Sequence, residues 1–122
     1  RRRFMSNRAA AERRGRRAEA VAALLLRLKG WRILGRRMRT RVGEVDLVAR
    51  RGRTLAFVEV KARDSAEGLD LAVDAFRLRR VAAAAEALAP RFARPDDAIR
   101  IDVILIAPRC WPRHLANVWH GC

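Results

Sequence analysis

The chain opens with apolar residues spaced every three or four positions, a pattern that predicts a helix from about Asn7 to Lys29, stopped by Gly30. Its expected core stripe follows i, i+3, i+4, i+7 spacing and consists of Val21, Leu24, Leu25 and Leu28. Glu19 lies on roughly the opposite side, among small apolar neighbours. A carboxylate in such surroundings is unusual for a helix surface, so Glu19 is a candidate functional residue, although most helical glutamates are simply solvated.

Two stretches of period-two alternation follow, residues 43–49 and 55–61, and predict a β-hairpin. The connection contains Gly52-Arg53, and glycine at the first central position favours a type II′ turn. That turn sets Arg51 opposite Thr54, so the numbers of paired residues sum to 105.

This register predicts that Asp46 faces Glu59 and that Glu44 faces Lys61. Directly opposed residues have Cβ atoms only about 4.5–5.5 Å apart, where two carboxylates repel each other. A divalent cation removes the repulsion, because Mg²⁺ is typically held by one or two carboxylates together with substrate phosphates. The alternative is a solvated sheet face on which the charges happen to align. Lysine is rare in this arginine-rich chain, and an amine at Lys61 supplies a compact point charge beside the acids.

The remaining patterns complete an α-β-β-β-α-β order, a mixed sheet flanked by helices in one α/β domain spanning residues 1–122. The other expected elements are a strand over Trp31–Met38, a loop over Arg63–Leu71, a helix over Asp74–Ala89 ended by Pro90, a central strand over Ile99–Ala107, and a short edge strand or helix over Leu115–Trp119. Val81, Ala84, Ala85 and Leu88 form the apolar stripe expected of the second helix.

The charge balance of the chain indicates an anionic partner. Its 122 residues carry a formal net charge of +15, and nucleic acid is the leading candidate because neutralised phosphates release counterions. An anionic membrane surface is the alternative, but no sustained basic amphipathic helix stands out beyond the N-terminus. No apolar run approaches the ~18 residues of a spanning helix. The two cysteines form no disulfide framework, which favours the reducing cytoplasm. Residues 1–8 are interpreted as a basic arm or a ragged end.

Arginines crowd the first half of the second predicted helix at positions 77, 79 and 80. Cations there oppose the helix macrodipole, so phosphate binding explains them better than helix stability, with a solvated face as the competing interpretation.

Two weaker hypotheses concern a zinc site and aromatic stacking. Cys110, His114, His120 and Cys122 are residue types that bind zinc, but their spacing matches no standard finger. Trp31, Trp111 and Trp119 have the chemistry to stack on unpaired bases, although packing is their commoner use.

Taken together, several motifs resemble those of the YraN-like bacterial proteins, a largely uncharacterised family of the restriction-endonuclease-like, PD-(D/E)XK, superfamily. The resemblance rests on Gly43-Glu44-Val45-Asp46-Leu47-Val48 and Phe57-Val58-Glu59-Val60-Lys61-Ala62-Arg63, on Gly15-Arg16-Arg17-Ala18-Glu19, on Lys29-Gly30-Trp31-Arg32-Ile33-Leu34, and on Ile101-Asp102-Val103 with His114-Leu115-Ala116-Asn117. One departure is Arg77-Leu78, which stands where related sequences usually carry Lys-Gln.

Likeness to archaeal Holliday-junction resolvases implies a restriction-endonuclease-like αβββαβ core and a metal-dependent nuclease site. It implies that Asp46 and Glu59, with the backbone carbonyl of Val60, bind Mg²⁺ or Mn²⁺, that Lys61 is the third active-site residue, and that Glu19 is an additional acid. Arginines of the two helices would grip the nucleic-acid backbone: Arg16, Arg17, Arg77, Arg79 and Arg80. DNA is the expected substrate, branched or junction DNA included, and resolution of a junction implies a homodimer. The competing hypothesis is a nucleic-acid-binding protein that keeps the nuclease fold with little or no turnover.

Overall fold

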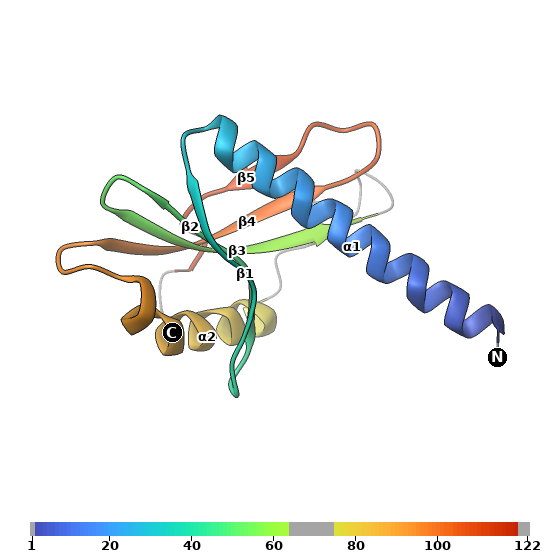
Figure 1. Cartoon of the computed structure of the whole chain (residues 1–122), viewed down its shortest axis with the longest axis horizontal. Coiled ribbons are helices and arrows are strands. Elements are labelled where there is room, and N and C mark those ends of the chain that lie inside the picture. Colours follow the sequence, from blue (N-terminus) through green and yellow to red (C-terminus); the bar gives the residue numbers. More distant parts are fainter. Residues whose placement is uncertain (1, 64–74, 120–122) are drawn as a thin grey trace.

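A five-stranded sheet with a helix on each face forms the body of the molecule (Figure 1). The computed structural model describes residues 2–63 and 75–119. Its elements are α1 (Arg2–Leu28), β1 (Arg32–Arg39), β2 (Glu44–Arg51), β3 (Thr54–Ala62), α2 (Ala75–Phe92), β4 (Ala98–Ile106) and β5 (Arg113–Leu115). The predicted α-β-β-β-α-β order is confirmed, and the C-terminal region adds a short strand that begins earlier than expected.

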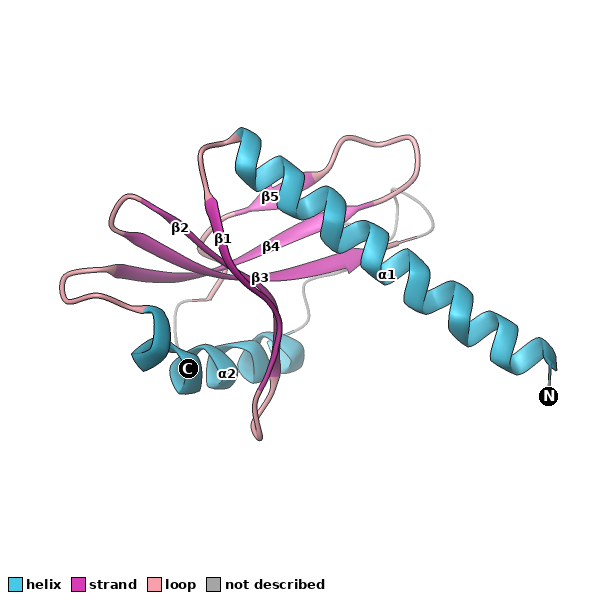
Figure 2. Cartoon of the chain, viewed as in Figure 1, coloured by secondary structure: helices cyan, strands magenta, loops and turns pink. Residues whose placement is uncertain are grey.

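The strands lie in the order β1-β2-β3-β4-β5, so every neighbour in the sheet is also a neighbour in sequence (Figure 2). All pairs are antiparallel except β3 and β4, which run parallel. Parallel strands need a crossover connection, and α2 provides it. The mixed sheet predicted from the sequence is therefore confirmed, with β4 in an interior position and buried over residues 101–105.

The β2–β3 turn has the predicted geometry. Gly52 has a φ of 60°, whereas Arg53 is not among the positive-φ residues, as expected of a type II′ turn. Pairing runs from Arg51↔Thr54 to Leu47↔Val58, which confirms the predicted register over these residues. The pairing ends there, before Asp46 and Glu59.

A bulge interrupts the pairing of β1 with β2. Ile33 pairs with Ala49 and Gly35 pairs with Val48, which are adjacent residues of β2. Leu34 is therefore an extra residue of β1 without a partner on β2. Beyond the bulge the pairing continues regularly to Arg39↔Glu44. The extra residue bends the strand and increases its local twist.

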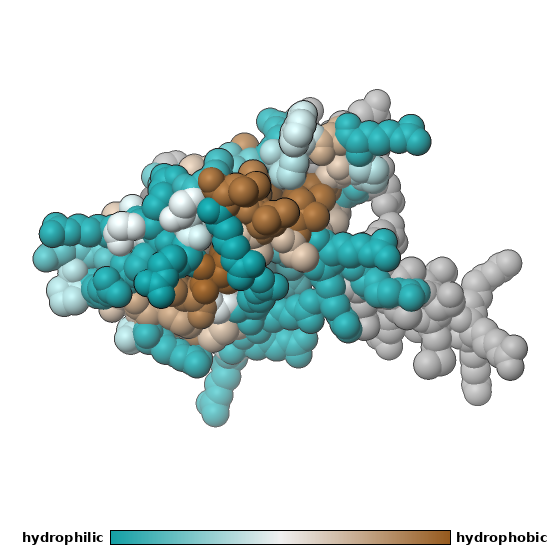
Figure 3. Space-filling view, turned by 45° about the horizontal axis from the view of Figure 1, so that its top comes forward, coloured by the Kyte–Doolittle hydropathy of each residue, from teal (hydrophilic) through white to brown (hydrophobic). Residues whose placement is uncertain are grey.

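The expected core stripe of α1 is wrong at three of its four positions, while the fourth, Leu25, is partly buried against the core as expected. Val21, Leu24 and Leu28 are 41%, 56% and 77% exposed, and Figure 3 shows hydrophobic side chains gathered on the face that α1 crosses. The helix instead packs through a side rich in alanine: Ala18, Ala22, Ala23 and Leu26. Small side chains let the helix approach the sheet closely, and Trp31, Leu47 and Val58 cover them from below. Glu19 follows Ala18 and is therefore carried to the edge of this buried side.

Two further boundaries differ from expectation. The helix α1 already begins at Arg2, so the residues interpreted as a basic arm continue it, and Figure 1 shows that end projecting beyond the sheet. The helix α2 runs through Pro90 to Phe92. Proline removes only its own hydrogen bond near the end of a helix, and Phe92 packs against the core on the α2 side of the sheet. Residue 74 and most of the predicted loop over 63–71 lie outside the described residues.

Gly43 sets how closely the β1–β2 turn approaches α2. A Cβ atom at this position would lie 2.3 Å from the backbone oxygen of Arg80. We expect Gly43→Ala to lower the free energy of unfolding by about 2 kcal/mol or more, because backbone atoms on α2 must move. Gly15→Ala is the matched control, since nothing lies within 4 Å of its Cβ, and it should stabilise helix α1 by up to about 1 kcal/mol. Urea unfolding of both variants measures the difference; equal effects would contradict the close packing.

Candidate active site

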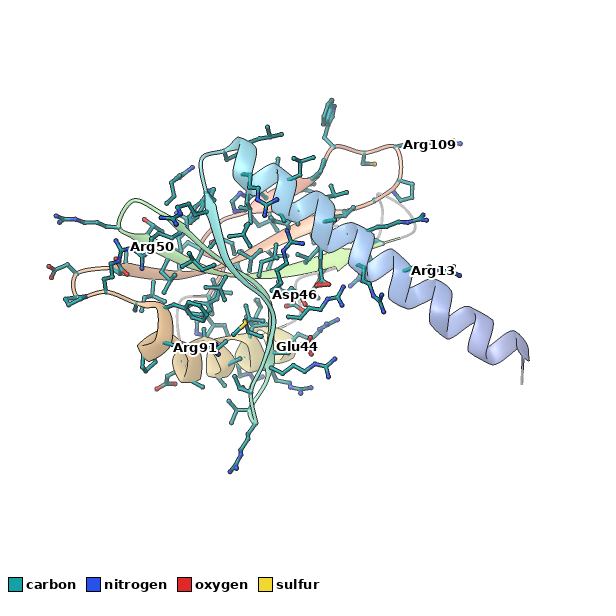
Figure 4. All side chains as sticks on the ribbon, viewed as in Figure 1. Arg13, Glu44, Asp46, Arg50, Arg91 and Arg109 are labelled. Carbon is teal, nitrogen blue, oxygen red and sulfur yellow. The ribbon has the colours of Figure 1, made fainter. Side chains whose placement is uncertain are left out.

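Asp46 lies where β2 and β3 separate. The backbone pairing of β2 with β3 stops beyond Leu47↔Val58. There the Asp46 carboxylate accepts a hydrogen bond from the Val60 backbone N–H at 2.7 Å. A buried N–H without an acceptor would be costly, so the side chain replaces the missing strand partner. In the view of Figure 4, Asp46 lies between the ribbons of α1 and α2. The site is thus built at the point where the sheet opens.

The ionisation of Asp46 is strongly perturbed. Burial, helped by the nearby carboxylates of Glu19, Glu59 and Glu44, raises the pKa of its carboxyl group to about 6, against the lowering effect of the Val60 hydrogen bond. Several acids therefore act on one partly buried carboxylate. Such crowding of negative charge is costly without a cation and is typical of functional sites.

Glu59 is the most buried acid of this group, with only 4% of its surface exposed. Its Oε1 atom forms an ion pair with Arg77 at 3.0 Å. Its Oε2 atom is buried and has no hydrogen-bond partner among the described residues. Lys61, two positions along β3, is equally buried at 4% exposed. Strand alternation places both side chains on the same face of the sheet.

Glu19 joins the site from α1, held by an arginine that the sequence analysis missed. Arg37 donates from Nε to both carboxylate oxygens of Glu19 at 3.0 Å. Arg36 pairs with Leu47 and Met38 pairs with Val45, so Arg37 of β1 lies opposite Asp46 of β2. Its φ of 49° is left-handed, which is uncommon for a residue other than glycine and is often found at functional sites. No motif predicted this contact, because it depends on the β1 bulge and on the packing of α1.

The raised pKa of Asp46 predicts a pH-dependent stability. The folded chain keeps this proton up to about pH 6, while an unfolded aspartate loses it near 3.8, so the free energy of unfolding falls as pH rises between these values. We expect Asp46→Asn to raise that free energy by about 3 kcal/mol well above pH 6 in EDTA, and to change it little below pH 4. The amide oxygen still accepts from Val60.

Urea unfolding at pH 4 and pH 7.5 tests this expectation. Asp96→Asn is the control, since it makes the same chemical change at an exposed aspartate whose φ of 71° asparagine tolerates. An Asp46→Asn variant no more stable than the wild type at pH 7.5 would contradict the raised pKa.

The acids fit a hard divalent cation. In the described part of the chain no three His, Cys, Asp or Glu side chains form a ready-made metal cluster. Mg²⁺ does not need one, because it accepts one or two carboxylates and completes its shell with water and substrate phosphates. The unpartnered Oε2 of Glu59, the Asp46 carboxylate and the carbonyl of Val60 supply oxygen ligands of the kind that this ion prefers.

The arginines predicted to grip nucleic acid do not all lie in one place. Arg77 reaches the site through its ion pair with Glu59, while Arg79 and Arg80 are exposed further along α2. Arg16 and Arg17 are exposed on α1, on the turn before Glu19. The departure from the family pattern at Arg77-Leu78 is also explained, since Leu78 packs into the core on the α2 side while Arg77 contacts the acid.

A second buried carboxylate, Asp102 on β4, is fully engaged by its neighbours. It accepts from Arg100 Nε and Nη2 at 3.1 Å, from His114 Nε2 at 2.7 Å and from the Asn117 backbone N–H at 2.9 Å. Burial alone would raise the pKa of Asp102, but the hydrogen bonds from His114, Arg100 and Asn117 lower it. This cluster ties β5 and the chain after it to the sheet.

The same cluster bears on the zinc hypothesis. Lys29 Nζ lies 2.8 Å from His114 Nδ1, so both ring nitrogens of His114 are engaged. Cys110 is an exposed free thiol, while His120 and Cys122 lie outside the described residues. The arrangement is that of a structural histidine. Its two partners are best satisfied by a neutral ring that carries its proton on Nε2, because an ammonium group only donates.

At the far end of β2, Arg50 forms another structural ion pair (Figure 4). Its two terminal nitrogens donate to the two oxygens of Asp97 at 3.0 and 2.6 Å, and these hydrogen bonds lower the pKa of Asp97 to about 2. The pair fastens the loop before β4 and takes no part in the acidic site.

The sheet and its crossover helix form a restriction-endonuclease-like fold. Consistent with this, the fold is similar to that of Hjc, a Holliday junction resolvase from Archaeoglobus fulgidus, with a TM-score of 0.58 and 20% identity over 82% of this chain and 73% of that one. At this identity the likeness establishes the fold.

The chain belongs to the uncharacterised protein family UPF0102, whose model matches residues 18–106. The resemblance to the YraN-like proteins is thereby confirmed. UPF0102 proteins of Sphingopyxis alaskensis and Rhizorhabdus wittichii are 74% and 64% identical to it, over 92% and 96% of this chain and 97% and 99% of those proteins. None of the described helices is both long enough and apolar enough to cross a membrane.

Proposed function

We propose that this protein is a metal-dependent nuclease that hydrolyses phosphodiester bonds in DNA, with branched or junction DNA as the preferred substrate. The observation that carries the proposal is the buried Glu59 carboxylate, whose Oε2 has no hydrogen-bond partner among the described residues, beside a perturbed Asp46 and on the same strand face as a buried Lys61. The fold neighbour, a Holliday junction resolvase, supports the choice of substrate class.

Asp46, Glu59 and the carbonyl of Val60 would hold Mg²⁺ or Mn²⁺. When bound, such an ion polarises the scissile phosphate and lowers the pKa of a coordinated water. The protein contributes the positions of the ligands: the Val60 N–H fixes the Asp46 carboxylate, and the sheet fixes Glu59 at the start of the gap between the strands. These fixed acids need no rearrangement when substrate arrives, which favours electrostatic catalysis.

Lys61 would orient the attacking water or take its proton, and its charge would offset that of the phosphate. An ammonium group in a buried place exerts a stronger field than one in water. Glu19 would bind a second ion or a metal-bound water, with Arg37 holding it in the meantime. The two lie on different elements, so α1 and β1 both take part in the site.

Arg77 is placed to exchange partners. Its ion pair with Glu59 neutralises that acid, yet the arginine side chain is about half exposed and can turn towards a phosphate. Arg79 and Arg80 follow on α2, and Arg16 and Arg17 are exposed on α1. These arginines would bind the backbone and carry no sequence preference themselves. We place the protein in the cytoplasm, and, since resolution of a junction needs two cuts, we propose a homodimer on that substrate.

The test is cleavage of an end-labelled panel consisting of a four-way junction, a flap, single-stranded DNA and duplex DNA, each with Mg²⁺, Mn²⁺ or EDTA. Lys61→Gln, checked for folding by thermal melting, is assayed beside the wild type. We expect cleavage only with a divalent cation, fastest on a branched substrate and greatly reduced in the variant. Sedimentation with and without the junction measures the dimer.

Tight, salt-sensitive binding with no metal-dependent cleavage would overturn the nuclease and favour the second candidate, a DNA-binding protein on a nuclease fold. That candidate is supported by the net charge of +15, which suffices for binding by itself.

A further inference from the structure

The three tryptophans of the chain lie in different environments. Trp31 is 3% exposed, and the guanidinium carbons of Arg51 and Arg100 lie over its ring, 4.7 and 5.1 Å from the centroid. Trp119 is partly buried against the core on the α2 side. Trp111, in contrast, is 90% exposed. A ring exposed to this extent adds little to the core and offers an aromatic face and a polar N–H to a ligand.

Trp111 sits on a short connection that is fixed at both ends. The connection leaves β4 after Ile106 and re-enters the sheet at Arg113, which pairs with Leu105. It contains Pro108, whose φ is fixed by its ring, and Arg109, whose φ of 61° is left-handed. Pro112 restricts the backbone of Trp111 to extended conformations. The ring is therefore displayed on a backbone of limited freedom.

This connection lies at the catalytic end of the sheet. The strands β3 and β4 are parallel, Lys61 pairs with Leu105, and the Arg63 N–H donates to the carbonyl of Ile106 at 2.9 Å. Trp111 is six positions beyond Leu105, so even a fully extended chain would keep it within about 20 Å of that pair. The proposed site and the connection that carries Trp111 thus lie at the same end of β3 and β4.

The charge around the ring selects its ligand. No acidic residue occurs between Asp102 and the last described residue, while Arg109 and Arg113 are exposed on either side of Trp111, and Figure 4 shows Arg109 at the outer edge of the connection. An aromatic face between cations suits a ligand with a flat ring attached to an anion. Unpaired nucleotides have this chemistry, because each base offers a π face beside its phosphate.

We propose that Trp111 is a stacking platform for an unpaired base next to the cleavage site. This inference rests on the proposed function, which places DNA at the acidic site, and it adds a preference among DNA structures. Duplex DNA hides its base faces, so the ring favours substrates with unpaired nucleotides, such as flaps and open junctions. The arginines bind the backbone of any substrate, and Trp111 makes the protein bind unpaired strands in preference to paired ones.

Binding without cleavage tests the proposal. In EDTA, tryptophan fluorescence and the anisotropy of a labelled strand are measured with a 15-nucleotide oligo(dT) and with a 15-base-pair duplex. We expect oligo(dT) to quench the wild-type emission. We expect Trp111→Ala to remove that quenching, to weaken oligo(dT) binding about 5- to 100-fold, and to change duplex binding less than about two-fold. Trp111→Phe should recover most of the oligo(dT) affinity, since it keeps an aromatic face.

Equal losses of oligo(dT) and duplex binding, or no loss of either, would overturn the stacking role. A change of oligomeric state in Trp111→Ala, seen by sedimentation without DNA, would overturn it too and assign the ring to a contact between copies. The nuclease is judged separately: quenching intact with no metal-dependent cleavage defeats the proposed function alone, and cleavage intact with no quenching defeats the stacking platform alone.

Discussion

Glu59→Gln is expected to lower the rate of metal-dependent cleavage by about 10²- to 10⁴-fold, the range found when one fixed catalytic charge is removed. The substitution keeps the shape of the side chain and removes only the charge. Glu59 is buried, its Oε2 has no hydrogen-bond partner in the described part of the chain, and Arg77 is exposed enough to be solvated without it. The fold should therefore survive, and the free energy of unfolding should stay the same or rise.

Single-turnover cleavage of the best substrate measures the effect on the rate, and binding in EDTA measures the effect on substrate affinity. Glu86→Gln is the matched control: the same chemical change on the exposed side of α2, with no expected effect on rate. A Glu59→Gln variant that cleaves as fast as this control would remove Glu59 from the site. A loss of binding equal to the loss of rate would assign it to substrate affinity instead.

Asp102→Ala is expected to lower the free energy of unfolding by about 3–5 kcal/mol, because it leaves buried charged and polar partners unpaired. Arg100, His114 and the Asn117 N–H all lose their acceptor at once. The loss is a large share of the stability of an ordinary domain, about 5–15 kcal/mol. Asp102→Asn, which keeps an acceptor oxygen, should lose less and remain measurable if the alanine variant fails to fold.

Urea unfolding measures both variants, with Glu86→Ala as the exposed control. The sign of the pH dependence is opposite to that of Asp46: the pKa of Asp102 is lowered, so its contribution is present above the ordinary aspartate pKa and is lost as pH falls below it. Asp102 variants with the stability of the control would show that β5 is held by other contacts.

The comparison of the two acids shows what the site costs. Asp102 is surrounded by donors and stabilises the fold, whereas Asp46 is surrounded by carboxylates and destabilises it at neutral pH. Only the second arrangement leaves a crowded negative charge for a cation to neutralise. Stability given up at one carboxylate and supplied at another is the pattern expected of a functional site.

The fold was largely predictable because its strongest signals are local. Period-two alternation and a glycine turn fix the β2–β3 hairpin and its register. The end of α2 predicted from Pro90 lies within one helical turn of the observed end at Phe92. The packed face of α1 was not predictable in the same way. This helix is apolar on both sides near Leu24 and Leu26, and periodicity does not say which stripe meets the sheet. Alanines allowed the closer approach.

For the candidate site, sequence reasoning brought out Asp46, Glu59, Lys61 and Glu19. The structure places Glu19 and Glu59 close enough to Asp46 to raise the pKa of its carboxyl group. Their catalytic roles remain a prediction. Arg37 was missed, and the ion pair of Arg77 with Glu59 was not foreseen, because both depend on how α1 and α2 pack across the sheet. The unusual setting of Glu19 among alanines was the one sequence signal of that packing.

The bulge at Leu34 has a consequence for the length of the chain. Its neighbours, Ile33↔Ala49 and Gly35↔Val48, are consecutive pairs on the β2 side, so losing one residue there would leave every other strand partner in place. A deletion at Arg36 would instead shift part of β1 by one position and replace the residue that stands across from Asp46. Among relatives, we therefore expect insertions and deletions in this strand to gather at position 34, a form of tolerance that scanning by substitution would never reveal.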